Sequence, residues 1–373
     1  MSDLLKYKQI NWIDGMRINK DHFIGQENHF NARLNDINEN NLTPNTFGLL
    51  PHKGDPAQGF SIRAVMDNQN FLKVTVQSCH ALTPGGYRIE IGSETEEKKD
   101  FIVQDVETLY DVAARKSDDL FLILVTDPFS RFPVGSADSE EYPLRLPFVR
   151  PSYKLHLVPA DQVAGHNLGP DMLSLGRITL KNDIPEILKT YIPPCTSIDS
   201  HPRLIEFHAY VDQQVSSMEA SIVKIIYDIN EKHASNILTE VVTGISEGIL
   251  SFISSNITRL RWFLKSQPPV YLFEFVVVLA RVLKNAYDVR TKEEKETLLD
   301  YFSEHFGIVQ NRFKKLLENT IGMEYDHVDI YKSIEKSEDF LNVISVLFSE
   351  LSKMELIAGK KKVEQRQIDI ILR

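Results

Sequence analysis

The hydrophobic pattern of this chain changes near residue 200, and that change constrains the fold more than any other feature. Before it, apolar and polar residues alternate with a period of two, which is the pattern of strands with one buried face. Turn-forming clusters separate these segments, at a spacing typical of a β-sandwich. The predicted strands are 59–65, 71–76, 87–91, 120–125, 153–158 and 173–180. We therefore predict an α+β chain that begins with an antiparallel β-sandwich over residues 1–190.

One helical insert precedes these strands. Four apolar residues fall at helical intervals within an otherwise polar segment, namely Phe23, Phe30, Leu34 and Ile37. This periodicity predicts a helix on the N-terminal side of the first strand.

Residues 191–203 are rich in proline, which suits neither a helix interior nor a central strand. We predict a hinge there, around Tyr191, Pro193 and Pro194. After the hinge, two apolar series recur every seven residues and together give a mean spacing of 3.5 residues, which is typical of a coiled coil. They are Leu204, Val211, Met218 and Ile225, and His208, Val215, Ile222 and Ile229. One long helix in a single-chain bundle would show the same pattern, so both interpretations stay open.

Further amphipathic or apolar segments predict more helices. They cover 237–265, 270–287, 292–317 with a break near Gly307, and a last helix marked by Phe340 to Met354. The predicted division is a sandwich over 1–190, a hinge over 191–203, a helical bundle over 204–320 and a short remainder over 321–373.

Charge and composition exclude several classes of protein. The formal net charge is −10, which argues against a nucleic-acid binder, because phosphate binding needs clustered Lys and Arg. The two cysteines, Cys79 and Cys195, are too few for a disulfide framework and suit a reducing compartment. The longest apolar run, 270–283, contains two charged residues and is too short to span a bilayer. We expect a cytoplasmic protein that is not integral to a membrane.

The sequence shows little sign of catalysis. Gly244–Gly248 matches the G-x-S-x-G motif around Ser246, but that motif needs a strand before the serine, and the flanking residues suit a helix. Histidines seven residues apart, such as His22 and His29, lie too far apart on a helix to share a metal. We expect no enzyme, no metal and no cofactor, and a serine hydrolase using Ser246 is the competing class.

Apolar residues at both ends of the chain stand outside the predicted core. Trp12 and Met16 lie in a short segment just before His22 and Phe23. That segment is either a strand edge folded back onto the sandwich or a surface for a partner, since Trp and Met are enriched at interfaces. The last residues, with Ile368, Ile370, Ile371 and Leu372, either add a strand to a sheet or dock a partner.

Three short motifs resemble one family. Trp12–Ile18 followed by His22–Phe23 is similar to the opening W-x-[acid]-G-M-x-[aliphatic]-x-x-x-H-F signature of the TssK family of type VI secretion baseplate proteins. Leu175–Ile178, which is followed by Tyr191–Cys195, is similar to a second family segment, and Pro269–Glu274 is similar to the start of a later family helix. The motifs occur in the family's order, which makes the resemblance specific.

The resemblance implies a homotrimer with a sandwich like the shoulder of phage receptor-binding proteins, a helical neck and a C-terminal head. It implies a structural adaptor of a contractile injection system that links the TssF and TssG wedge to the membrane complex, at the inner face of the cytoplasmic membrane. The family trimer favours the intermolecular coiled coil, so we expect both seven-residue series to form the trimer neck. We expect the wedge contact at Trp12, Gly15, Met16, His22 and Phe23.

One departure from the family concerns the head. Only residues 321–373 remain after the predicted bundle, whereas the family head is larger and mixed α/β. We expect a shortened or replaced head, with Ile368 to Leu372 facing a membrane-complex partner of uncertain identity. A phage-type receptor-binding protein that recognises a glycan through the sandwich is the alternative function.

Overall fold

The computed structural model describes residues 6–54, 58–92, 105–113, 115, 117–163, 168–182, 184–306 and 310–353. The chain divides into two compact units. The first, here called the sheet unit, contains the described residues up to Pro202 together with His327–Ile330. The second, the helical unit, contains Arg203–Asp326 and the described residues from Tyr331 onward. Each unit is described by itself.

The first sheet of the sheet unit is built around one long strand, β3 (Phe71–Leu82). This strand pairs antiparallel with the other four, which are β1 (Gly48–Leu49), β2 (Phe60–Met66), β4 (Arg88–Ile91) and β5 (Val106–Asp111). Its side chains alternate, and Leu72, Val74 and Val76 are fully buried. This is the period-two pattern predicted from the sequence.

The second sheet contains four antiparallel strands in the order β7-β6-β8-β9. They are β6 (Asp119–Val134), β7 (Phe148–Pro159), β8 (Met172–Lys181) and β9 (Ile184–Ile187). Antiparallel sheets followed by helices confirm the predicted α+β class. The strands β1, β5 and β9 were not predicted. Strand β1 has only two residues and cannot show a period, and β9 contains Pro185, which argues against a strand.

The two sheets touch at defined points. A Cβ atom on Gly176 of β8 would lie 2.9 Å from Cδ1 of Ile62 on β2, so glycine allows the close approach. The Tyr153 hydroxyl of β7 accepts a hydrogen bond from the Glu90 N–H of β4 at 3.2 Å. Next to Gly176 and within the second sheet, Arg177 of β8 donates two hydrogen bonds to the Asp119 carboxylate of the neighbouring strand β6, at 2.7 and 2.5 Å. The Leu175–Ile178 motif thus lies at a contact between the sheets.

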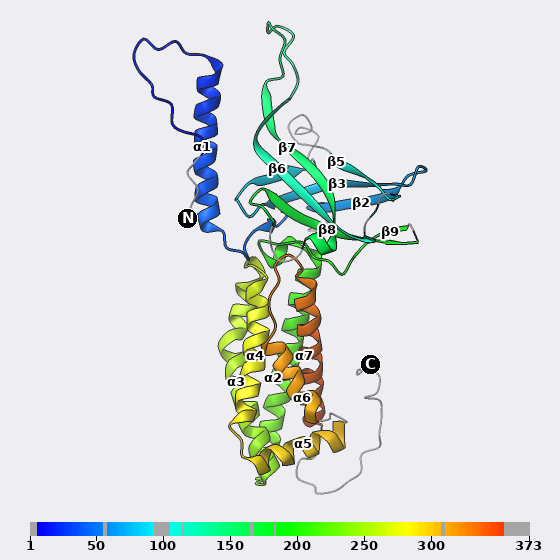
Figure 1. Cartoon of the computed structure of the whole chain (residues 1–373). Coiled ribbons are helices and arrows are strands. Elements are labelled where there is room, and N and C mark those ends of the chain that lie inside the picture. Colours follow the sequence, from blue (N-terminus) through cyan, green and yellow to red (C-terminus); the bar gives the residue numbers. More distant parts are fainter. Residues whose placement is uncertain are drawn as a thin grey trace. The chain divides into compact units, whose positions relative to one another are not determined.

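Strands β6 and β7 continue beyond the rest of their sheet as a long hairpin (Figure 1). Their register shifts after Asp127 and resumes at Phe132, which pairs with Arg150. We call Phe132–Val149 the arm. Every residue from Tyr142 to Val149 is exposed.

The predicted hinge is corrected by the structure, because it is part of the sheet unit's core. Tyr191–Cys195 is buried throughout. The Leu49 N–H donates to the Pro194 carbonyl at 2.7 Å, and the Tyr191 hydroxyl lies 2.6 Å from Ser174 Oγ. A hinge needs a segment with few buried contacts, whereas this one is fixed on β1 and β8.

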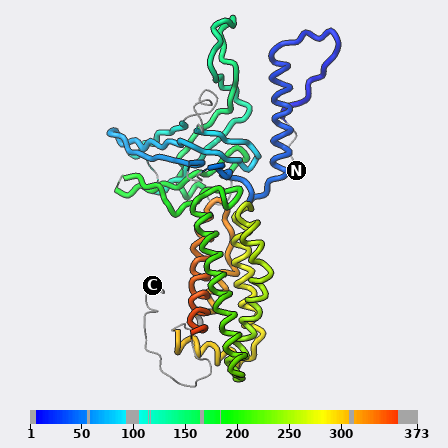
Figure 2. The backbone as a smooth tube through the Cα atoms, turned by 180° about the vertical axis from the view of Figure 1, so that it is seen from behind, coloured from blue at the N-terminus to red at the C-terminus, as the bar shows by residue number. Residues whose placement is uncertain are grey.

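The helical unit is a bundle in which α2 (Pro202–Glu231), α3 (Ile237–Trp262), α4 (Val270–Asp288) and α7 (Tyr331–Leu351) run side by side (Figures 1 and 2). The predicted segment 292–317 forms two helices, α5 (Lys292–Phe306) and α6 (Gln310–Ile321). Helix α3 is long and apolar enough to cross a membrane by length and composition alone, with 39% of its most apolar window buried. Its buried stripe, which includes Val241, Ile245 and Ile249, faces the bundle.

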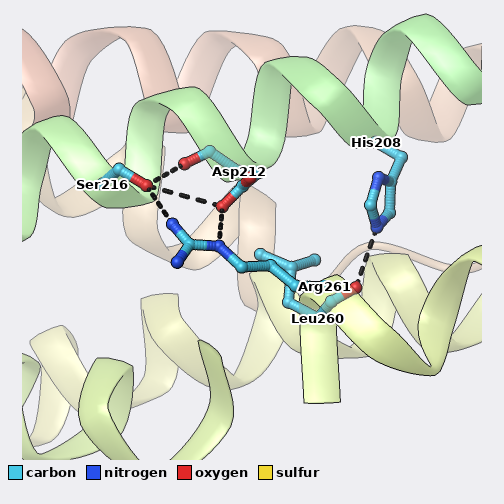
Figure 3. A network of polar contacts seen from close by, with 5 residues as sticks. All are labelled: His208, Asp212, Ser216, Leu260 and Arg261. Carbon is cyan, nitrogen blue, oxygen red and sulfur yellow. Dashed lines mark hydrogen bonds and ion pairs between the residues drawn. The ribbon is translucent and has the colours of Figure 1, made fainter. Parts of the chain in front are cut away.

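The seven-residue seam of α2 packs inside the single chain, which corrects the intermolecular interpretation. All eight residues are buried, namely Leu204, His208, Val211, Val215, Met218, Ile222, Ile225 and Ile229. They leave no surface for a second copy, so the single-chain bundle is the better interpretation. A polar network fastens this helix to α3 (Figure 3). His208 Nε2 lies 2.9 Å from the Leu260 carbonyl, and Arg261 donates to Asp212 and to Ser216, each at 2.8 Å.

The C-terminal remainder does not form a third unit among the described residues. Helix α7 packs against α4 and α6 and buries one face, which includes Phe340, Ile344 and Leu347. The segment just before it, His327–Ile330, belongs to the sheet unit. There His327 Nε2 lies 2.8 Å from the Phe47 carbonyl, beside β1. The structure therefore shows two units where the sequence predicted three and a hinge.

Candidate partner interface

The opening signature forms a tight turn. The Met16 N–H donates to the Ile13 carbonyl at 3.3 Å, and Gly15 has a φ of +77°. A residue with a side chain would be strained at that φ, although a Cβ atom there would meet nothing within 4 Å. The glycine of the signature is therefore required by the backbone conformation and not by crowding.

The next residues begin helix α1 (Lys20–Asn41). Asn19 Oδ1 accepts hydrogen bonds from the N–H groups of Asp21 and His22, at 3.0 and 3.3 Å. His22 Nδ1 accepts a hydrogen bond from the Asn19 N–H at 3.2 Å, which completes a reciprocal cap. The histidine of the signature thus has a structural role at the start of α1.

The structure places three of the five predicted wedge residues, Trp12, His22 and Phe23, together around this helix start, and Gly15 and Met16 lie in the turn before it. The Trp12 ring lies 6.0 Å from the His22 ring and 6.4 Å from the Phe23 ring, measured between centroids. Trp12 is 43% exposed, and Ile13, Ile18 and Phe23 are more exposed still. We call Trp12, Ile13, Ile18 and Phe23 the N-terminal apolar cluster. Ile13 and Ile18 lie in the predicted signature segment, but they were not among the five predicted contact residues.

The cluster is held against the body of the sheet unit through the opposite face of α1. His29 Nδ1 lies 3.0 Å from the Tyr7 carbonyl, and a Cβ atom on Gly25 would lie 3.1 Å from Ile10 Cδ1. The Tyr7 ring packs on Phe129 at 4.5 Å between centroids. The segment before α1 therefore lies along one side of the helix and leaves the other side open.

That open side of α1 carries an apolar stripe. Phe23, Phe30, Leu34 and Ile37 are each between 55% and 60% exposed. At about 100° per residue they lie within about 40° of one direction, whereas His29 and Ala32 point the other way and are buried. The predicted helical insert is confirmed, but the described part of the chain does not cover its apolar face. An exposed apolar stripe of this kind marks a binding surface.

A groove of about 560 Å³ lies beside the stripe, between α1 and the turns and strands next to it. Leu34 and a row of amides line one wall, and Gly86, Tyr87, Pro128 and Pro151 line the other. Asn38 Nδ2 donates to the Gly86 carbonyl at 3.4 Å and joins the two walls. Burial and the nearby carboxylates of Glu39 and Asp171 raise the pKa of the Tyr87 phenol, which therefore stays neutral. Neutral donors and apolar side chains suit a protein ligand better than an ion.

The competing hydrolase interpretation is contradicted by the position of Ser246. This serine lies inside α3 and is fully buried, and its Oγ has no hydrogen-bond partner among the residues that the structure describes. A nucleophile elbow needs a strand followed by a sharp turn, and helix surrounds Ser246 on both sides. In the described part of the chain, no group of three or more His, Cys, Asp or Glu side chains could hold a metal. The predicted membrane-side residues Ile368, Ile370, Ile371 and Leu372 lie outside the described residues.

No protein-family model and no curated protein sequence matches the chain. Solved structures do. A crystal structure of TssK matches with a TM-score of 0.53 and 13% identity, over 91% of this chain and 69% of that one. TssK from EAEC in complex with a nanobody matches with a TM-score of 0.53 and 12% identity, over 87% and 99%.

The chain has the fold of TssK. A further match, with 12% identity over 91% of this chain and all of that one, is to the cryo-electron microscopy structure of a TssK-TssF-TssG baseplate subcomplex, at a TM-score of 0.47. The two TssK structures with TM-scores of 0.53 confirm, at the level of the fold, the resemblance seen in three short motifs. In this fold the first motif contains Gly15, which has a φ of +77°, and the second contains Gly176 at the contact between the sheets and the buried Pro194.

Proposed function

We propose that this chain is a structural adaptor of a type VI secretion baseplate. In this proposal it is a cytoplasmic homotrimer that links the TssF and TssG wedge to the membrane complex. The fold of TssK supports the proposal, since TssK stands with TssF and TssG in a baseplate subcomplex. The observation that carries it is the exposed N-terminal apolar cluster, because the family's opening signature builds this surface.

In this proposal each of the two units corresponds to one domain of a TssK protein. The sheet unit is the shoulder-type sandwich, and the helical unit is the neck. Trp12, Gly15, Met16, His22 and Phe23 make the wedge contact, with Trp12 as the anchor and Gly15 and His22 shaping the turn and helix start. The stripe on α1 extends this surface. Residues Ile368 to Leu372 would serve the membrane side.

The test is capture of TssF and TssG by the intact chain. Replacing a central aromatic anchor commonly costs about 2 kcal/mol or more of binding free energy, which is more than tenfold in affinity. Trp12→Ala should therefore weaken binding at least tenfold without changing the melting temperature. Trp262→Ala is the matched control, since Trp262 is exposed but lies in the helical unit. Equal binding by the Trp12→Ala variant and the unaltered chain would contradict the assignment.

A further inference from the structure

Helix α1 is not oriented by a buried apolar face. All 22 residues of this helix are described, and only His29 and Ala32 among them are buried, whereas the α1 stripe is exposed. Most helices in proteins owe their stability to the packing of an apolar face. The direction of α1, and with it the position of the N-terminal apolar cluster at its start, therefore depends on a few separate contacts.

One of these contacts fixes the C-terminal half of α1. Asn38 Nδ2 donates to the Gly86 carbonyl at 3.4 Å, and a Cβ atom on Gly86 would lie 2.5 Å from Asn38 Cβ. Such a close approach leaves this end of the helix little freedom to shift. The cluster lies at the other end, because Phe23 precedes Asn38 by 15 residues, or about 22 Å along the helix axis.

The N-terminal half of α1 is held by an irregular part of β6. The register between β6 and β7 breaks after Asp127 and resumes at Phe132, so residues 128–131 face only Pro151 of β7. We call residues 128–131 the β6 bulge. Proline has no N–H to pair with a neighbouring strand, which suits a break in the ladder. The Asp127 carboxylate also accepts a hydrogen bond from the Phe129 N–H at 3.0 Å, which fixes the bulge.

The β6 bulge contacts both segments that build the N-terminal apolar cluster. The Phe129 ring lies 4.5 Å from the Tyr7 ring, between centroids, and this contact holds the segment before α1. Arg131 Nη1 donates to the Glu27 carboxylate at 2.6 Å, and this ion pair holds α1 itself. His29 Nδ1 lies 3.0 Å from the Tyr7 carbonyl and joins the two segments to each other. Bulges commonly re-aim side chains in this way.

The ion pair lies close to the cluster. Glu27 follows Phe23 by four residues, which is about 6 Å along the helix axis. The contact at Asn38 fixes the distant end of the helix, so a change at the β6 bulge moves the end that carries the cluster. Phe129 and Arg131 themselves are not part of the cluster.

We propose that Phe129 and Arg131 are positioning residues for wedge binding, which act by orienting the N-terminal apolar cluster. The inference rests on the wedge contact of the proposed function and adds the part of the sheet that sets its direction. The Arg131 and Glu27 side chains are 33% and 50% exposed, and ion pairs this exposed contribute little to folding. The loss of this pair therefore affects wedge binding more than global stability.

The first test exchanges the charges of the ion pair and measures capture of TssF and TssG by the intact chain. Arg131→Glu should weaken binding about 2- to 30-fold, because two carboxylates then repel each other and α1 turns away from the bulge. Adding Glu27→Arg restores a pair of opposite charges, so the double variant should regain the binding of the unaltered chain. The melting temperature should stay close to that of the unaltered chain in both variants.

The matched control is Arg145→Glu, which breaks an exposed ion pair with Glu141 on the arm, where no contact with α1 is found among the described residues. This variant should bind TssF and TssG like the unaltered chain. A double variant that binds as weakly as Arg131→Glu alone would overturn the proposal.

A second measurement follows the cluster without the wedge proteins. The chain has two tryptophans, so Trp262→Phe leaves Trp12 as the single fluorescent reporter. In that background Phe129→Ala should increase the quenching of Trp12 by acrylamide, because the segment before α1 is then no longer held. Phe129→Tyr keeps a ring against Tyr7 and should restore the original quenching. Equal quenching in all three chains would overturn the proposal.

These outcomes are distinct from those that test the wedge contact. Weaker binding by Trp12→Ala together with unchanged binding by Arg131→Glu would overturn the positioning role alone. Unchanged binding by both variants would contradict the wedge contact itself, and this inference with it.

Discussion

Two glycines of the sheet unit are required for different physical reasons. Gly48 has a φ of +116°, and a Cβ atom there would lie 2.1 Å from the carbonyl carbon and oxygen of Pro194. Gly15 has a φ of +77° with open space around it. The first therefore fixes how β1 packs on the Tyr191–Cys195 segment, while the second fixes only a surface turn.

This difference predicts that the same substitution to alanine costs much more stability at Gly48 than at Gly15. Gly48→Ala should lower the free energy of unfolding by at least about 3 kcal/mol, because backbone atoms must move. Gly15→Ala should strain only its turn, by about 1–2 kcal/mol, so it should weaken wedge binding and lower the melting temperature much less than Gly48→Ala does. Urea unfolding of both variants checks this, and similar unfolding midpoints for the two would contradict it.

His201 predicts a pH dependence of stability. Burial lowers its pKa from the ordinary 6.5 to about 4. Between these values the unfolded chain takes up a proton that the folded chain does not, so stability is full above about pH 6.5 and falls as the pH drops toward 4. The urea midpoint should therefore decrease as the pH is lowered from about 6.5 to 4. The His201→Gln variant should show a weaker dependence of the urea midpoint on pH. An unchanged slope in His201→Gln would show that other groups cause it.

At the scale of helices and strands, the hydrophobic period of the sequence predicted where most strands and helices lie. It did not predict which segments are buried by contacts with residues far away in the sequence. The strands over 59–91 and the long helices appear where the period of two or 3.5 placed them. The burial of Tyr191–Cys195 depends on β1, a two-residue strand far away in sequence, so no local pattern could show it. Likewise Phe30 and Leu34 predicted a helix, but which face the body covers depends on contacts such as Tyr7 to His29.

The seam of α2 gives a test at this scale. Because the side chain is fully buried in its own bundle, Ile222→Ala should lower the unfolding free energy by about 2–5 kcal/mol. It should leave the mass of the assembled protein unchanged, since the seam contacts no second copy. Chemical denaturation and light scattering on one sample measure both. Dissociation of the assembly without a loss of monomer stability would instead support the interpretation of this seam as an intermolecular coiled coil.

At the scale of the whole molecule, the described surface is apolar at three places in the sheet unit, namely the N-terminal apolar cluster, the α1 stripe and the arm. An isolated soluble monomer rarely exposes so much apolar surface on one unit, whereas a subunit of an assembly needs it. The motifs of the sequence led to the family fold, but none of them included the arm, whose Y-P-L-R-L-P-F segment resembles an ordinary loop.

Sedimentation of the purified chain, alone and after addition of TssF and TssG, tests the adaptor proposal most directly. The account predicts a particle of three times the 42.7 kDa chain mass that moves into a larger complex when the wedge proteins are added. A 42.7 kDa monomer whose sedimentation does not change on their addition would contradict it.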